Sequence, residues 1–249
     1  MESISRRELL KRTVAMAAGS SLLINSPVTA WANEKEAAVK VVLIRNQKLF
    51  AGGNSPDPAI CGQMLDEALC SLTGKKDAKE AWASIIKPTD VVGIKTNVWN
   101  GLPTPPELNE ILKARVQGVG VKEEDVSVDD RGVKTNPVFQ RSTALISIRP
   151  MRTHAWSGVG SLLKNYITFA EKLSDYHGDS CASLAELHGL PAVKGKTRLY
   201  VLALFTPQFH HLAASTFSEE FSWKYNGLAI GFDPVAVDSV GLRIIEAKR

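Results

Sequence analysis

Apolar and polar residues follow two different periodicities along this chain. Short, nearly continuous apolar runs recur, such as Val39–Arg45 (V-K-V-V-L-I-R) and Thr197–Phe205 (T-R-L-Y-V-L-A-L-F), and such runs are typical of strands covered on both faces. Between them lie segments with apolar residues at helical spacing, such as Pro58–Leu72. Strands alternate with helices, so the pattern predicts an α/β fold with a mainly parallel sheet and helices on both faces.

The elements expected from this pattern cover most of the chain after residue 38. The expected strands are Val39–Arg45, Asp90–Asn97, Asp125–Asp130, Ala144–Ile148, Thr197–Phe205 and Gly227–Phe232. The expected helices are Pro58–Leu72, Asp77–Ile86, Glu107–Val119, Leu162–Leu173, Ser180–His188 and Val235–Ala247. Asp233 before the last helix is a favourable N-cap, and Pro234 suits the first helical position.

The N-terminal residues have the pattern of an export signal. Arg6 and Arg7 lie in a charged segment, which is followed by the small and apolar residues 13–24 and by Ala30-Trp31-Ala32. A charged region, an apolar region and an A-x-A-like site are typical of a signal peptide, and the arginine pair resembles a twin-arginine signal. We expect residues 1–32 to be read by the twin-arginine export machinery and residues 33–249 to form a single periplasmic α/β domain. The alternative is a basic amphipathic first helix.

Composition narrows the class of protein further. A hydrophobic fraction of 44% and a charged fraction of 22% suit a globular domain that needs no disulfide or metal to hold its core. The net charge of +4 includes no Lys/Arg run after residue 32, so nucleic-acid binding has little support. The cysteines, Cys61, Cys70 and Cys181, show no C-x-x-C spacing. We therefore expect no iron–sulfur cluster ligated by this chain.

Titratable and polar residues concentrate in the stretch Met151–Tyr166, which we expect to form a turn and helix after a strand. His154 is the strongest single candidate, as a general base or metal ligand. Two glycines between Ser157 and Ser161 resemble an anion-cradling turn at a helix start, with Lys164 and Asn165 just beyond. We expect Ser157, Lys164 and Asn165 to bind the substrate. The alternatives are a structural histidine held by hydrogen bonds, and glycines that only let the helix pack closely.

Polar residues also follow two expected strands. Lys95 and Asn97 end one strand, and Asp129-Asp130-Arg131 end the next; ligands of open α/β sheets bind at the carboxyl ends of strands. Lys95 and Asn97 are candidates to bind an anionic group, with Lys95 also a candidate for proton transfer. The alternative is a solvated strand end.

The adjacent aspartates point in opposite directions on an extended chain, so they do not form an acid–base pair by themselves. We expect Asp129 to act in proton transfer or Asp130 to ligate a metal, with Arg131 as counter-charge and as a substrate-binding residue; the alternative is ordinary turn chemistry. His154, His177 and Asp130 would together make a 2-His-1-carboxylate metal site. The separation of the two histidines in sequence permits this site but does not demand it, so the cofactor stays open between a divalent metal and none.

Four motifs in order suggest a family. The runs V-G-I-K-T-N, D-D-R, H-A-W-S-G-V-G-S-L-L-K-N and G-F-D-P-V-A-V-D-S-V-G resemble the domain-of-unknown-function family 362, over the chain from Val39 to its end. This family has no settled reaction. The resemblance implies ferredoxin-like cysteine clusters in some members, which are not carried over here, and it leaves open a further C-terminal part of the domain beyond Arg249.

Three functional hypotheses follow from these residues. The first is an exported enzyme that acts on a small anionic substrate at the strand ends, either with a metal ion or with a cationic pocket. The second is a periplasmic ligand-binding protein with the same pocket and no chemistry. The third is a redox-accessory protein that works beside a cluster-bearing partner protein.

Overall fold

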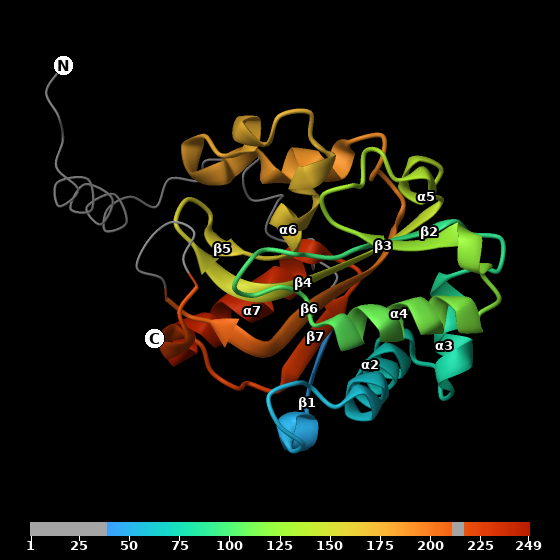
Figure 1. Cartoon of the computed structure of the whole chain (residues 1–249), viewed down its shortest axis with the longest axis horizontal. Coiled ribbons are helices and arrows are strands. Elements are labelled where there is room, and N and C mark those ends of the chain that lie inside the picture. The colour runs from blue at the N-terminus through green and yellow to red at the C-terminus, as the bar shows by residue number, and fades with distance from the viewer. Residues whose placement is uncertain (1–38, 211–216) are drawn as a thin grey trace, which may run out of the picture. The chain divides into compact units, whose positions relative to one another are not determined.

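The computed structural model of this protein describes residues 39–210 and 217–249 (Figure 1). The predicted export signal, residues 1–32, lies outside the described residues. No helix in the described part is long and apolar enough to cross a membrane.

The centre of the fold is a mixed sheet that contains seven strands in the part of the chain described. Its order is β1-β7-β6-β4-β2-β3, with β5 paired to β4. Strands β6, β4, β2 and β3 pair in parallel, whereas β7 is antiparallel to both β1 and β6. Five of the described strands, β1, β6, β4, β2 and β3, therefore run in one direction, and β7 and β5 run in the other. The sheet is mostly parallel, which confirms an α/β fold. The strands are β1 (Val41–Arg45), β2 (Val92–Lys95), β3 (Val126–Asp129), β4 (Ala144–His154), β5 (Gly158–Gly160), β6 (Thr197–Gln208) and β7 (Gly227–Gly231).

The helices follow the predicted order, with local signals at their ends. Asp57 and Asp233 cap α2 and α7 by accepting hydrogen bonds from two backbone N–H groups each. Gly74 ends α2 at φ 73°, a conformation that glycine adopts without strain. The α-helices are α2 (Pro58–Thr73), α3 (Ala78–Ile85), α4 (Pro106–Gly118), α5 (Pro137–Gln140), α6 (Leu162–Asn165) and α7 (Pro234–Lys248). The 3-10 helices are η2 (Gln47–Phe50), η3 (Glu123–Asp125), η4 (Tyr166–Phe169), η5 (Leu173–Tyr176), η6 (Asp179–Gly189) and η7 (Glu219–Phe221).

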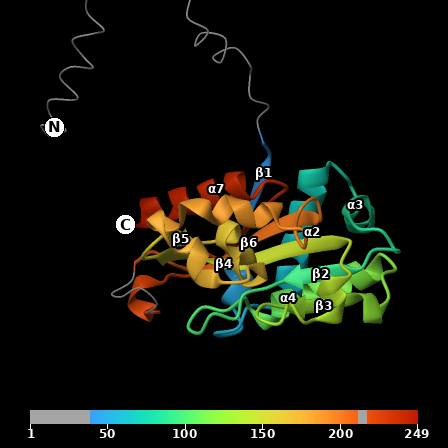
Figure 2. The same cartoon turned by 90° about the horizontal axis from the view of Figure 1, so that it is seen from above.

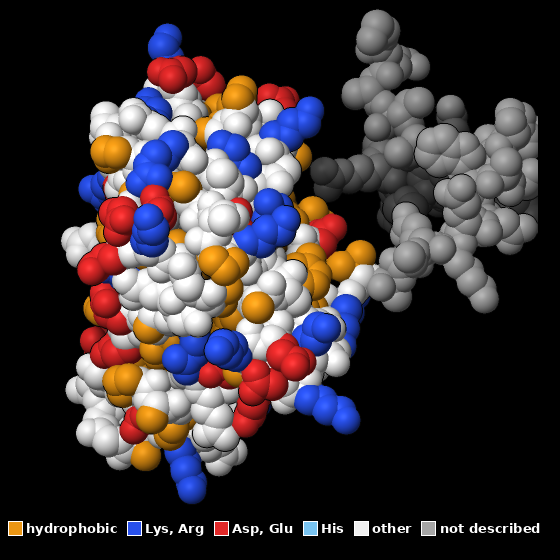
Figure 3. All heavy atoms as spheres, turned by 90° about the vertical axis from the view of Figure 1, so that its right-hand side faces the viewer, with side chains coloured by type: hydrophobic (Ala, Val, Ile, Leu, Met, Phe, Trp, Pro, Cys, Tyr) orange, Lys and Arg blue, Asp and Glu red, His pale blue; other side chains and the backbone are white. Residues whose placement is uncertain are grey.

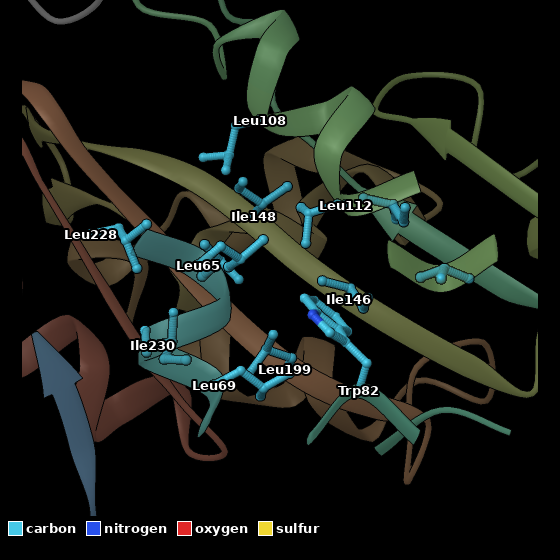
Figure 4. Packing of buried hydrophobic residues seen from close by; sticks show 14 of the residues in the cluster. Leu65, Leu69, Trp82, Leu108, Leu112, Ile146, Ile148, Leu199, Leu228 and Ile230 are labelled. Atoms are coloured by element: carbon cyan, nitrogen blue, oxygen red, sulfur yellow. The ribbon is translucent and has the colours of Figure 1, made fainter. Parts of the chain in front are cut away.

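Alternate residues of the same strands enter two separate hydrophobic clusters. One cluster joins Ile146 and Ile148 of β4 to apolar residues of α2, α3 and α4, as Figure 4 shows for Leu65, Trp82 and Leu108. The other contains Leu145, the next residue along β4, with residues of α7 and of the segment 162–193. In the view of Figure 2, the yellow and orange segment that begins at α6 lies in front of β4 and β6. Successive side chains of a β-strand point to opposite faces of the sheet, so neighbouring residues of β4 enter different clusters.

Two predictions about the segment after residue 148 are wrong in detail. The strand does not end at Ile148 but runs on as β4 to His154, and all of its residues are buried. A register shift between Pro150 and Arg152 accommodates the proline, which cannot donate a ladder hydrogen bond. β4 then turns into the short antiparallel strand β5, so a hairpin replaces the expected strand-to-helix turn.

The helices expected at Leu162–Leu173 and Ser180–His188 are mostly 3-10 turns. Only Leu162–Asn165 is α-helical; η4, η5 and η6 follow. Leu162, Tyr166 and Phe169 are nevertheless all buried. Apolar residues spaced three to four apart can be buried by either kind of helix, so the spacing does not distinguish them.

Candidate functional site

Four cationic side chains are buried where β2 and β4 end, beside α6. Lys95 is 0% exposed, Arg149 5%, Arg152 6% and Lys164 4%. We call these four residues the cation cluster. Lys95 and Lys164 were predicted site residues. Arg152 lies in the stretch Met151–Tyr166 but was given no role, and Arg149 was not predicted. On the face shown in Figure 3, by contrast, basic and acidic side chains are interspersed. Cations buried together are unusual because each one loses its hydration.

Lys95 is held by three acceptors. Its Nζ donates to Asp130 Oδ1 at 2.5 Å, to the Thr96 carbonyl at 2.7 Å and to Asn165 Oδ1 at 3.4 Å. Burial lowers the pKa of Lys95 to about 8, while Asp130 opposes that fall. An ammonium group with three protons and three acceptors has no proton directed at a substrate. The geometry therefore favours a structural and electrostatic role for Lys95 over the predicted catalytic one.

Arg149, unlike Lys95, has a hydrogen-bond donor with no acceptor among the described residues. It lies on β4 and is almost fully buried, yet its Nε has no hydrogen-bond partner within the described residues. Burial lowers its pKa to about 10, although Asp130 and Asp238 both act in the other direction. A guanidinium group carries five N–H donors in a fixed planar fork that matches a carboxylate or phosphate. Arg149 is thus a buried cation with its Nε donor unpaired among the described residues.

The guanidinium group of Arg152 lies between the Trp99 ring and Gly160. Its guanidinium carbon lies 3.9 Å from the centre of the Trp99 ring, and Gly160 faces it from β5, where an added Cβ would sit 3.2 Å from the same carbon. Nη1 donates to the Thr153 carbonyl at 3.1 Å, whereas Nε has no partner in the described part of the chain. Burial and the charge of Arg149 lower its pKa to about 9. A side chain at position 160 would force the Arg152 guanidinium to shift by a few tenths of an ångström.

Lys164, on α6, contacts a sulfur atom. Its Nζ lies 3.7 Å from Sγ of Cys181, which is a free and buried thiol. Burial lowers the pKa of Lys164, and the charges of Arg149 and Arg152 lower it further. Cys181 is brought there by three consecutive residues with left-handed backbone, at φ values of 44°, 55° and 63° for Asp179, Ser180 and Cys181.

A cavity of about 190 Å³ lies beside Lys164. Hydroxyl groups and one carboxylate line it together with apolar side chains. Its lining includes Ser157, Ser161, Lys164, Asp238, Leu184 and Val235. Lys164 therefore belongs both to the cation cluster and to a hollow in the molecule.

The predicted anion-cradling turn already holds an anion that belongs to the chain. The N–H groups of Leu162 and Leu163, at the start of α6, donate to the two carboxylate oxygens of Asp238 at 3.0 and 2.9 Å. Gly158 and Gly160 lie in strand β5 instead of a turn before the helix. Ser157 donates from Oγ to the Val159 carbonyl. The start of α6 is therefore anchored to α7 through Asp238.

His154 ends β4 as a neutral ring. Its Nδ1 accepts hydrogen bonds from the backbone N–H groups of Trp156 and Ser157, each at 3.3 Å. Burial, with Lys164 and the two arginines nearby, lowers its pKa to about 3. An Nδ1 that accepts leaves the proton on Nε2, which makes His154 a hydrogen-bond donor. This geometry opposes the roles of base and of metal ligand through Nε2, since both need a lone pair on that atom.

The three predicted metal ligands are not gathered around one point. The rings of His154 and His177 do stack, with centroids 6.3 Å apart, beside the half-exposed Trp156. Asp130, however, uses Oδ1 for Lys95 and Oδ2 for the N–H of Val98. Within residues 39–210 and 217–249, no group of three or more His, Cys, Asp or Glu side chains is arranged to hold a metal ion.

The remaining predicted residues have structural partners. Asp129 accepts from the Gly132 N–H and from Asn136 Nδ2, which is turn chemistry. Asn97 accepts from the Trp99 N–H. Arg131, in contrast, is exposed.

Asn165 ties three elements together. Its Nδ2 donates to the carbonyls of Lys95 and Ile148 and to Oγ of Ser147. The side-chain amide therefore fixes α6 to β2 and β4, and so positions Lys164 next to the arginines. Its expected role in substrate binding is better described as support for the cluster.

Sequence reasoning missed Arg149, Arg152 and the anchoring role of Asp238. The first two sit in R-P-M-R, directly after an apolar run. The sequence signal that could have identified them is a pair of charged residues that continue a buried strand without a break. A charged side chain at a buried position needs a partner of opposite charge or a hydrogen-bond acceptor.

Comparison of the chain with protein-family models, with curated proteins and with solved structures found no match in any of the three.

Proposed function

We propose that this protein is an exported α/β enzyme that binds a small anionic substrate in the cation cluster and acts on it there. The observation that carries the proposal is Arg149, a side chain 5% exposed whose Nε has no partner among the described residues. A buried donor that is left unpaired is unfavourable by about 1–3 kcal/mol, and more for a charged group, and perturbed charged groups concentrate at functional sites.

The balance of buried charge supports an anion and suggests its charge. Among the residues described, the cation cluster supplies four positive charges, and the buried carboxylates beside it are Asp130 and Asp238. Two positive charges therefore stay uncompensated. Burial raises the pKa of Asp238, and protonation of this carboxylate would increase the excess of positive charge. A ligand with two negative charges, such as a dicarboxylate or a phosphate ester, would balance the site.

The chemistry available at the site is polarisation and nucleophilic attack. His154 can donate from Nε2 to a substrate oxygen without carrying a charge, and Lys164 is a buried amine beside the cavity. A metal is not part of this proposal, because Nδ1 of His154 and both oxygens of Asp130 are engaged elsewhere.

The proposal retains three further expectations from the sequence. These are membership of family 362, export through the twin-arginine route to the periplasm, and a sheet covered by helices on both faces, which the two hydrophobic clusters support. Replacing Arg6 and Arg7 by lysines tests the export step: the periplasmic share of the protein should fall sharply. An unchanged share would refute twin-arginine export.

Thermal unfolding of the full chain with and without anions tests the binding step. Glutarate, a dianion, should raise the melting temperature, and butyrate, a monoanion, should raise it less. Arg149→Met should abolish the shift, while Arg131→Gln, which changes an exposed arginine outside the cluster, should retain it. No shift with any anion would refute the proposal.

Turnover then separates enzyme from binding protein. Release of product from a panel of small dianions would support an enzyme. Saturable binding without turnover of any of them would favour a periplasmic ligand-binding protein, and a copurifying cluster-bearing protein would favour the redox-accessory role.

A further inference from the structure

Lys164 and Cys181 form a buried pair of an amine and a thiol. Nζ of Lys164 lies 3.7 Å from Sγ of Cys181, and both residues are 4% exposed. The thiol is the one hydrogen-bond partner of this amine in the described part of the chain, and sulfur is a weak acceptor. A nucleophilic nitrogen and an oxidisable sulfur are therefore in direct contact.

The fold fixes the backbone of both residues. Asn165, which follows Lys164, anchors α6 to β2 and β4 through three hydrogen bonds from its amide. Cys181 is the last of three consecutive residues with left-handed backbone, and its N–H donates to the Gly178 carbonyl at 2.8 Å. Residues other than glycine adopt this backbone only at a cost, and such costs concentrate at functional sites. The lysine side chain itself has a flexible stem, which lets its nitrogen approach the sulfur.

A small oxidant has a route to this pair. The cavity of about 190 Å³ is lined by Lys164 of α6 and by Leu184 of η6, so it borders both elements that carry the pair. A cavity of this size is ample for a molecule little larger than water. Hydrogen peroxide is such a molecule, and it carries no charge that would have to be compensated inside the protein.

The other two cysteines, Cys61 and Cys70 on α2, have carboxylates nearby. Burial raises the pKa of Cys61 to about 12, and the carboxylates act in the same direction. Burial and carboxylates also raise the pKa of Cys70. The thiolate is the form that reacts with oxidants, so both residues are protected from oxidation. They serve as internal controls for Cys181 in the same molecule.

We propose that hydrogen peroxide couples Lys164 to Cys181 through a reversible S–N bond, a sulfenamide. The thiol gives its proton to the amine, and the thiolate sulfur attacks one oxygen of the peroxide. An S–O bond forms, the O–O bond breaks, and the leaving hydroxide takes the proton of the ammonium group and becomes water. The neutral amine then attacks the sulfenic acid, so that an S–N bond forms, the S–O bond breaks and a second water leaves. The sulfur loses two electrons in total, and these reduce the peroxide.

This inference goes beyond the proposed anion site, because it requires no bound ligand. Burial lowers the pKa of Lys164, which favours the neutral amine that the second step needs. The bond would remove one positive charge from the cation cluster and would tie α6 to η6. A thiol reductant would cleave the bond and restore both side chains.

Peptide mapping of the full chain tests the cross-link. The protein is treated with hydrogen peroxide, the remaining thiols are alkylated, and trypsin digestion follows without a reductant. We expect peptide 153–172 joined to peptide 173–194, with their summed mass less two hydrogen atoms, and loss of this species after dithiothreitol. Cys181 should react at least about tenfold faster than Cys61, because each unit by which a thiol pKa is raised lowers the thiolate fraction about tenfold. A joined species that retains an oxygen atom would refute the S–N bond.

Dimedone, which traps sulfenic acids, tests the role of the amine. In the wild-type protein the amine consumes the sulfenic acid, so Cys181 should carry almost no dimedone after peroxide treatment. Lys164→Met leaves the sulfenic acid without a nucleophile, and Cys181 should then be labelled. Lys172→Met, which changes an exposed lysine, is the matched control and should behave as wild type. Equal labelling of Cys181 in the wild type and in Lys164→Met, or oxidation of Cys70 alone, refutes the cross-link and leaves the anion site standing. The wild-type peptide map decides the question even if Lys164→Met does not fold.

Discussion

Arg149→Met should make the protein more stable when no ligand is present. Removal of a buried side chain normally destabilises a protein, so the direction of this effect is diagnostic. Arg149 is buried beside three other cations and has no hydrogen-bond partner for its Nε in the described chain. Methionine fills similar space with a flexible apolar side chain.

The magnitude follows from the pKa of Arg149. Burial lowers that pKa from 12.5 to about 10, after the favourable effects of Asp130 and Asp238 are included. At pH 7, below both values, the guanidinium is charged in the folded and in the unfolded state, so the whole difference opposes folding. It amounts to about 3 kcal/mol. Because repacking around methionine is imperfect, we expect a net gain of about 1–3 kcal/mol, within the range known for apolar replacement of buried charges.

The assay is equilibrium urea unfolding of the full chain at pH 7 in a buffer without multivalent anions. The midpoint should rise while the slope m stays constant, which identifies a change in stability. Arg115→Met is the matched control, because Arg115 makes a two-pronged ion pair with Asp66 on the other side of the sheet. That variant should lose about 1–2 kcal/mol. An Arg149→Met protein destabilised by as much as the control would refute the reasoning.

Three further variants test other contacts of the site. The pKa of His154 falls from 6.5 unfolded to about 3 folded, so between these values only the unfolded state binds the proton; the unfolding free energy should decrease by up to about 1.4 kcal/mol per pH unit as the pH drops through that window. His154→Gln should remove this part of the slope in a pH series of urea melts. Gly160→Ala places a Cβ 3.2 Å from the Arg152 guanidinium carbon and should weaken glutarate binding, measured by calorimetry, with little loss of stability; unchanged affinity would show that Arg152 is free to move. Asp238→Asn gives one of the two N–H groups at the start of α6 no good acceptor and should lower the unfolding free energy by about 1–3 kcal/mol, which a urea melt will measure.

The order of strands and helices was predictable because burial leaves a period in the sequence. Strand β6 and helices α2 and α7 lie close to their expected bounds. The antiparallel pairing of β7 was not predictable from periodicity, since an apolar run such as Gly227–Phe232 fits either direction. The extension of β4 was missed because Arg149, Arg152 and His154 look like loop residues until their common burial is known.

The candidate site was chosen through the rule that ligands bind at the carboxyl ends of strands. That rule drew attention to Lys95 and Lys164, which the fold connects through the hydrogen bond between Lys95 and Asn165, the residue after Lys164. It could not assign their roles. Whether a lysine is bonded, as Lys95 is, or available, as Lys164 is, depends on acceptors distant in sequence, such as Asp130 and Asn165.

The central claim is that the buried arginines of β4 bind an anion, and crystallography with selenate tests it most directly. Selenate is a dianion whose selenium atom can be placed without ambiguity by anomalous scattering. We predict an ordered selenate within hydrogen-bond distance of Nε of both Arg149 and Arg152 in crystals of the full chain, and none at that position in Arg149→Met. Selenate found only at surface lysines, with these two guanidinium groups left without an anion, would contradict the account.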